Sequence, residues 1–198
     1  MSDLSSIVKW VPRPDRSRAA LIDTAATLFR RQGYAATGLN QILEQAGVKA
    51  GSLYHHFPGG KQELAAAVVD SAGADIEKLL RSELARDVPV EMVVGQWVDL
   101  LAVGLAADCR DGCPVEPIAT ESVHASELVR RASARAFGGW CAALGERLRV
   151  DGWDAARADQ TALAVVSMIE GALILSRTAG DARALRATRA SAQSLLRR

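Results

Sequence analysis

Apolar residues recur at helical spacing along most of the chain. The first such stretch, residues 16–32, places apolar side chains on one helical face, and Gly33 follows it. A second helix is expected over 39–46 and a third, shorter one over about 50–56. Thr37 is expected to cap the start of the second helix, and Gly47 to end it with a positive φ.

The pattern continues beyond Pro58, with helices expected over most of the remaining sequence. No alternating strand pattern of useful length and no internal repeat is evident, so the expected fold is all-α with about nine helices. The expected division is a flexible arm over 1–15, a helix-turn-helix domain over 16–62 and a second helical domain over 63–198. The later helices are expected over about 61–87, 92–105, a short turn within 108–122, then 128–148, 154–178 and from about 181.

Charge is distributed unevenly, although the whole chain of 198 residues carries a net charge of only +1. Residues 1–61 hold eight basic and four acidic side chains, a net +4, which leaves 16 basic and 19 acidic side chains, a net −3, for the remainder. The N-terminal third is therefore the part suited to a polyanion.

No run of about 18 uncharged apolar residues is evident, and the N-terminus lacks the apolar run of a signal peptide, so we expect a cytoplasmic protein without a membrane partner. Three cysteines form no disulfide framework. Cys109 and Cys113, with His124, invite a metal or thiol-sensing interpretation. Two thiols and one distant imidazole are too few for a zinc site, so no metal and no cofactor is expected.

The third expected helix carries polar groups that an ordinary core helix does not need. Leu53 and Phe57 face inward, whereas Ser52 before them and Tyr54, His55 and His56 between them are polar. Two short helices joined by a glycine-containing turn, packed on a longer helix, form a helix-turn-helix whose second helix enters the major groove of DNA.

The segment "GYAATGLNQILEQAGVKAGSLYHHFPGGKQEL" closely resembles the DNA-binding segment of the TetR family of bacterial regulators, over about residues 16–64. "GCPVEPIATES" further resembles the branch that includes lincomycin-resistance-type repressors. The resemblance implies a homodimer on double-stranded operator DNA. It assigns phosphate contacts to Thr37, Tyr54, His56 and Lys61, and base-facing positions to Lys49, Ala50, Gly51, Ser52 and His55.

Two residues depart from that family pattern. Lys49 stands where many relatives have a helix-capping serine, and Ala50 stands where many carry a longer polar residue. Because lysine cannot accept a hydrogen bond from the free amides of a helix start, we expect a weakly capped third helix.

Bulky residues of the C-terminal part are candidates for a small-molecule pocket. Glu170 interrupts the most apolar run of the chain, "ALAVVSMIEGALIL", where an unpaired carboxylate is costly. It either pairs with Arg177 or another base, or recognises a ligand donor or cation. The candidates for contact with an apolar or aromatic effector are Trp97, Leu101, Phe137, Trp140, Met168 and Glu170.

The last two long helices are expected to form the dimer interface, because the helix over 154–178 is apolar on more faces than one core covers. The candidate interface residues are Leu173, Leu185, Thr188, Ala192 and Leu195.

The leading hypothesis is a repressor that a small apolar molecule releases from a palindromic operator. Two alternatives stay open: a DNA-binding regulator without small-molecule control or acting as an activator, and an enzyme using the cysteines and histidine. No nucleophile elbow, phosphate loop or paired-carboxylate arrangement supports the enzyme, so none is expected.

Overall fold

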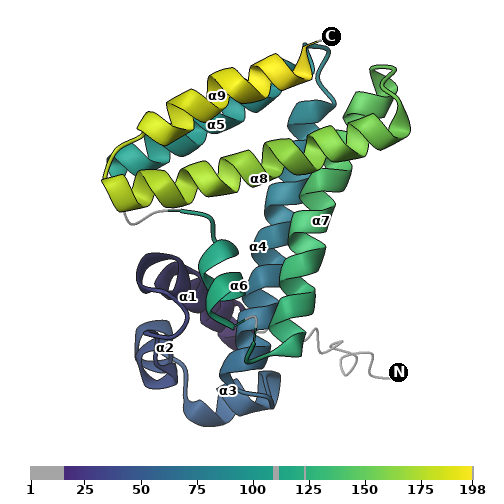
Figure 1. The fold of residues 1–198 in the computed structure, drawn as a ribbon. Helices are drawn as coiled ribbons and strands as arrows, with labels where there is room; N and C mark the ends of the chain where they lie inside the picture. The colour runs from purple at the N-terminus through teal and green to yellow at the C-terminus, as the bar shows by residue number, and fades with distance from the viewer. Residues whose placement is uncertain (1–15, 109–111, 123, 198) are drawn as a thin grey trace, which may run out of the picture.

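The computed structural model describes residues 16–108, 112–122 and 124–197, and these form nine helices and no strand (Figure 1). The expected arm over 1–15 lies outside the described residues. The all-α expectation is confirmed. The helices are α1 (Arg16–Gln32), α2 (Leu39–Ala46), α3 (Ala50–His56), α4 (Lys61–Leu84), α5 (Val90–Ala107), α6 (Glu116–Ser122), α7 (Glu127–Val150), α8 (Ala155–Ala179) and α9 (Arg183–Leu196).

Helices α1, α2 and α3 form a small unit at one end of the molecule (Figure 1). Its core joins Phe29 of α1, Ile42 of α2, and Leu53 and Phe57 from α3 and its C-cap, each no more than 2% exposed. Gly47 ends α2 in the left-handed conformation, with φ 64°, as expected. We call α1–α3 the reader and the remaining helices the body.

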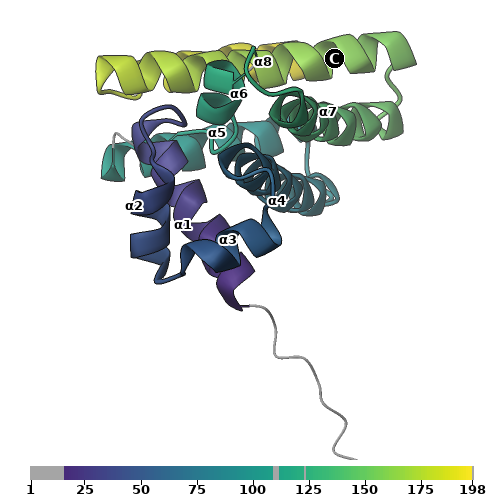
Figure 2. The ribbon, with the colours of Figure 1, turned by 90° about the horizontal axis from the view of Figure 1, so that it is seen from below.

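Helix α4 runs from the reader into the body and packs lengthwise against α7 (Figures 1 and 2). The two helices approach closely at Gly73, where an added Cβ would lie 2.6 Å from the Cβ of Ala136. One turn further along α7, the buried indole Nε1 of Trp140 donates a hydrogen bond of 3.0 Å to the carbonyl oxygen of Gly73. The absence of a side chain at Gly73 therefore sets the crossing of α4 and α7.

The far end of the body is a layer formed by α5, α8 and α9, which lies opposite the reader (Figures 1 and 2). Helix α9 packs against both α5 and α8, and α8 also packs against α7. By length and composition alone, α5 and α8 could cross a membrane, which the sequence pattern did not indicate. Since both are packed within the body, we read them as its core helices.

Arg147 of α7 fixes the link between α4 and α5. Its guanidinium donates to the carbonyl oxygens of Leu84, Arg86 (3.0 Å) and Val88 (2.7 Å), and Nε donates to Asp151 at 2.9 Å. The planar fork of arginine thereby satisfies carbonyl groups that the end of α4 leaves without helical partners.

The expected cap of α2 is wrong. The N-cap is Gly38, without a side-chain hydrogen bond, and Thr37 is fully buried one residue earlier. The Thr37 hydroxyl donates to the carbonyl oxygen of Gly33 at 2.7 Å and accepts from Gln32 at 3.1 Å. This residue braces the turn between α1 and α2 instead of capping α2.

Gly73→Ala should destabilise the fold by about 1–3 kcal/mol, because the new methyl group overlaps Ala136 on a packed helix. Adding Ala136→Gly should restore much of that loss, with a coupling of about 1 kcal/mol or more in a double-mutant cycle. The measurement is chemical denaturation of the single and double variants.

Gly138→Ala on α7 is the matched control, since an added Cβ there meets nothing within 4 Å. The free energy of unfolding of Gly138→Ala should rise by up to about 1 kcal/mol, because alanine has a higher helix propensity than glycine. A similar increase in stability for Gly73→Ala would contradict the close approach of α4 and α7 at Gly73.

Candidate nucleic-acid interface and buried pocket

Helix α3 presents a polar surface on the side away from its buried residues. Lys49, Ala50, Gly51, Tyr54 and His55 are exposed. Ser52 and His56 are half-buried on the same short helix. The expected outward positions thus lie together at the end of the molecule, where they could reach a groove of DNA.

The start of α3 is open, as the sequence indicated. Lys49 occupies the N-cap position and makes no side-chain cap hydrogen bond. An added Cβ at Gly51 meets nothing within 4 Å, so no protein atom obstructs an approach to this turn. The free amides here are suited to an anion such as phosphate.

Lys61 begins α4 beside the reader surface. Its Nζ lies 4.3 Å from the ring centroid of Tyr34 and 3.5 Å from the carbonyl oxygen of Ala35. Burial lowers the pKa of Lys61, and the nearby carboxylate of Glu121 opposes that shift. Lys61 is therefore held by a ring and a carbonyl group in a fixed place next to the turn between α1 and α2.

Thr37 does not share this surface. Its side chain is fully buried, and its hydroxyl is engaged by Gly33 and Gln32, so in this conformation it has no hydroxyl to offer a phosphate. The sequence pattern placed Thr37 as a small polar residue before a helix. It did not reveal that the turn between α1 and α2 buries this side chain.

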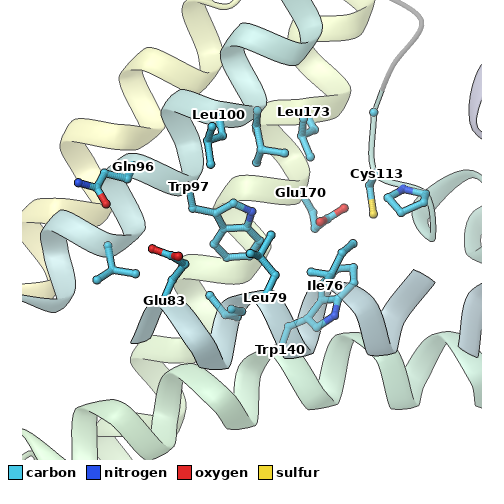
Figure 3. A pocket seen from close by; sticks show the side chains of 15 residues that line it. Ile76, Leu79, Glu83, Gln96, Trp97, Leu100, Cys113, Trp140, Glu170 and Leu173 are labelled. Atoms are coloured by element: carbon cyan, nitrogen blue, oxygen red, sulfur yellow. The ribbon is translucent and has the colours of Figure 1, made fainter. Parts of the chain in front are cut away.

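The body encloses an apolar pocket of about 380 Å³ between α4, α5, α7 and α8 (Figure 3). Its size falls within the range of small-molecule sites. Leu79 and Leu100 are both exposed and mark its mouth between α4 and α5. The lining consists of Ile76, Leu79, Leu80, Glu83, Val93, Gln96, Trp97, Leu100, Leu101, Gly112, Cys113, Pro114, Trp140, Glu170 and Leu173.

The structure brings most of the expected effector residues together. Trp97, Leu101, Trp140 and Glu170 line the pocket. Phe137 does not: it packs edge-on against Trp140, with 5.1 Å between ring centroids. Met168, an expected effector residue, is not part of the pocket lining. Glu83 is part of it, although the sequence analysis did not single it out.

Glu170 has no basic partner among the described residues. Its Oε2 is buried without a hydrogen-bond partner. Burial raises the pKa of Glu170 to about 7; a hydrogen bond with the Cys113 thiol opposes the shift, and the charge of Glu116 adds to it. The alternative in which Glu170 pairs with Arg177 is wrong, since the Arg177 guanidinium donates instead to the carbonyl oxygen of Arg30 at 3.3 Å.

Cys113 is a buried pocket residue without the properties of a reactive thiol. Burial, with the neighbouring Glu170 carboxyl, raises the pKa of Cys113 well above its usual range, which disfavours the thiolate. Cys109 lies outside the described residues. In the described part of the chain, no group of three or more His, Cys, Asp or Glu is arranged to hold a metal ion.

The candidate dimer residues divide into two groups. Leu185 and Ala192 are fully buried within the protomer, and Leu173 is 4% exposed and lines the pocket, so as surface residues these three expectations are wrong. Thr188 is half-buried, and Leu195 is exposed. Of the α9 stripe chosen from the sequence, Leu185 and Ala192 are therefore on the side that packs within the body, and Leu195 is not.

Three contacts join the body to the reader away from α4. Glu121 at the end of α6 accepts a hydrogen bond from the backbone N–H of Ala35 at 2.5 Å. Arg31 forms a 3.2 Å ion pair with Asp108, which follows α5, and Arg177 of α8 reaches the end of α1. The Glu121 contact could not be found from the sequence pattern, because its partner is a backbone amide 86 residues away.

Two family profiles match the chain. Residues 21–68 match the bacterial regulatory proteins of the tetR family, and residues 89–191 match the C-terminal domain of LmrA/YxaF-like transcriptional regulators. The first match covers most of the reader and the start of α4, and the second covers most of the body.

Individual proteins agree with the profiles. The chain is 35% identical over 168 residues to the HTH-type transcriptional regulator LmrA of Bacillus subtilis, covering 82% of this chain and 87% of LmrA. It is 36% identical over 166 residues to the HTH-type regulator YxaF of the same organism, covering 83% and 87%.

Solved structures show the same fold. A TetR transcriptional regulator from Legionella pneumophila superposes with a TM-score of 0.80 at 20% identity, over 90% of this chain and 96% of that one. The reduced form of NemR from E. coli gives a TM-score of 0.78 at 19% identity, over 91% and 97%. Together, the two profiles and the regulators identify this chain as a member of the TetR family of bacterial transcriptional regulators, with an LmrA/YxaF-like C-terminal domain, and not as an enzyme.

Proposed function

We propose that this chain is a cytoplasmic repressor that binds a palindromic operator as a homodimer and leaves it when a small apolar molecule enters the body. One observation carries the proposal: a single chain joins an exposed polar recognition helix to a lined pocket of ligand size. Helix α3 lies near the start of α4 (Figure 1), whereas the pocket is lined by α4 residues from Ile76 to Glu83, so one can act on the other only through the fold.

The reader supports contact with duplex DNA. The exposed positions of α3 would face base edges, with Tyr54, His56 and Lys61 on the phosphates at either side. Because one helix of seven residues reads only a few base pairs, two readers related by a two-fold axis double the sequence information.

The outward faces of α8 and α9 support the homodimer. The exposed residues of α8 between 160 and 178 carry no charge and include Leu163, Ile174 and Leu175, of which Leu175 is 63% exposed. Ser167 and Gly171 lie between them, and their small size permits a partner helix to approach closely. Leu195 is exposed on α9, which packs against α8, and we place it in the same interface, so that a second copy would cover both helices.

The segment after the pocket offers a direct route to the reader. Gly112, Cys113 and Pro114 line the pocket and lead into α6, whose last turn carries Glu121. The Glu121 carboxylate holds the amide of Ala35 and lies close to Gly33, where an added Cβ would be 2.5 Å from its Oε1. A ligand that displaces the pocket wall would therefore move the turn between α1 and α2 and the Lys61 beside it.

A regulator without small-molecule control, or one that activates transcription, remains the second candidate. It would keep the reader and the dimer, but its pocket would be core packing only. If a ligand that binds the pocket releases the protein from operator DNA, the leading proposal is supported and a regulator without small-molecule control is excluded.

Lys61→Ala should weaken binding to every DNA sequence and reduce the salt dependence by about one ionic contact per protomer, because a phosphate contact is sequence-independent. Substitutions of Ser52 or His55 should instead change base preference, within an inverted-repeat footprint. Footprinting and salt titration of DNA affinity measure both effects.

Lys78→Ala is the matched control: an exposed lysine of the same helix, 17 residues further on, or about 25 Å along the axis. It should leave affinity and salt slope unchanged. The assignment of Lys61 is wrong if the two variants behave alike, and a footprint without an inverted repeat would count against the two-fold reader.

Leu175→Arg and Leu195→Arg should each produce monomers that bind operator poorly, because a charge would be buried without a partner in the proposed interface. Sedimentation at micromolar concentration measures the oligomeric state. Val150→Arg, at an 82% exposed position at the end of α7, should remain dimeric. If both leucine variants remain dimers, the interface lies elsewhere.

A further inference from the structure

The pocket contains one polar group that the protein itself leaves unsatisfied. Glu170 projects from α8 between Trp97 and Cys113 (Figure 3). Its Oε2 is buried and accepts no hydrogen bond. A buried carboxylate oxygen without a donor is costly, so its place in a ligand-sized cavity suggests that the missing partner comes from the ligand.

Among the described residues, the lining of the pocket supplies no cation. The described lining residues include two carboxylates, Glu83 and Glu170, and no lysine or arginine. Glu83 already has a partner, since the guanidinium of Arg86 lies 2.7 Å from its Oε2. On the neighbouring segment and α6, Cys113 carries a neutral thiol and Glu116 adds negative charge. Arg177 is engaged with Arg30.

Aromatic rings complete the environment of Glu170. Trp97 and Trp140 line the same pocket. The indole N–H of Trp140 is used by the carbonyl oxygen of Gly73, so that side chain offers the pocket only ring surface. Aromatic rings beside a carboxylate are the surroundings in which proteins hold organic ammonium groups, by cation–π attraction together with charge.

We propose that the effector is an apolar organic cation, an aromatic body carrying a positively charged nitrogen, and that Glu170 holds the charged end. The inference rests on the proposed function of the pocket and specifies its ligand class. A neutral effector that donates a hydrogen bond to Glu170 is the competing chemistry. It would satisfy one oxygen atom, whereas a cation also supplies a countercharge to the ionised carboxyl.

The test uses two probes of nearly identical shape. One is (naphthylmethyl)trimethylammonium, and the other is its neutral isostere neopentylnaphthalene, in which carbon replaces nitrogen. Tryptophan fluorescence measures their affinities. The wild-type protein should prefer the cation, and Glu170→Gln should lose about tenfold or more of the cation's affinity while binding the neutral probe at least as well.

A pH series on the unmutated protein provides an independent readout. The cation binds the ionised carboxyl, and with a pKa of about 7 Glu170 is mostly protonated at acid pH. Affinity for the permanently charged probe should therefore rise with pH, by about tenfold between about pH 6 and pH 8. The neutral probe should show no such rise.

Glu83→Gln is the matched control, a second lining carboxylate whose charge Arg86 already compensates. Glu83→Gln should reduce the affinity for the cationic probe much less than Glu170→Gln does. Equal losses in the two variants, or equal wild-type affinities for the two probes, would overturn the cation inference and leave the pocket proposal intact. Failure of both probes to bind the wild type would count against the proposed effector pocket itself.

Discussion

The close crossing of α4 and α7 at Gly73 is the constraint on which the rest of the structure depends. With no side chain at that position, α7 lies against α4 tightly enough for Trp140 to donate its indole proton to the Gly73 carbonyl oxygen. The same contact places the Trp140 ring in the wall of the pocket. Because α4 begins at Lys61, beside the reader, the crossing also sets where the reader stands relative to the body.

Two of the connections between the pocket and the reader differ in kind. Helix α4 is a continuous rod that begins at Lys61, beside the reader, and contributes pocket residues from Ile76 to Glu83. Helix α6 follows the pocket wall at Cys113 and holds the reader through the Glu121 carboxylate. A ligand that moves either one changes the free energy of DNA binding, and DNA must then change ligand affinity by the same factor.

Local pattern predicted the elements well, because helix periodicity and glycine stops are local properties. The start of α4 at Lys61 and the bounds of α3 were read from the sequence, as was the uncapped Lys49. What failed depended on the three-dimensional arrangement. Leu185 and Ala192 were assigned to the dimer interface, but the arrangement of α5, α8 and α9 buries both within the protomer. Glu170 was singled out as a carboxylate in an apolar run, but the sequence did not show that its Oε2 lacks a partner or that Arg177 donates to a carbonyl group of α1.

Coupling between pocket and reader is the central claim, and ligand affinity measured with and without operator DNA tests it most directly. Of the two naphthalene probes, the tighter binder would be titrated against free protein and against the operator complex. We expect weaker ligand binding to the operator complex than to the free protein, and a smaller difference in Glu121→Ala, which lacks the contact to Ala35. Equal affinities for the free protein and the complex would contradict the central claim.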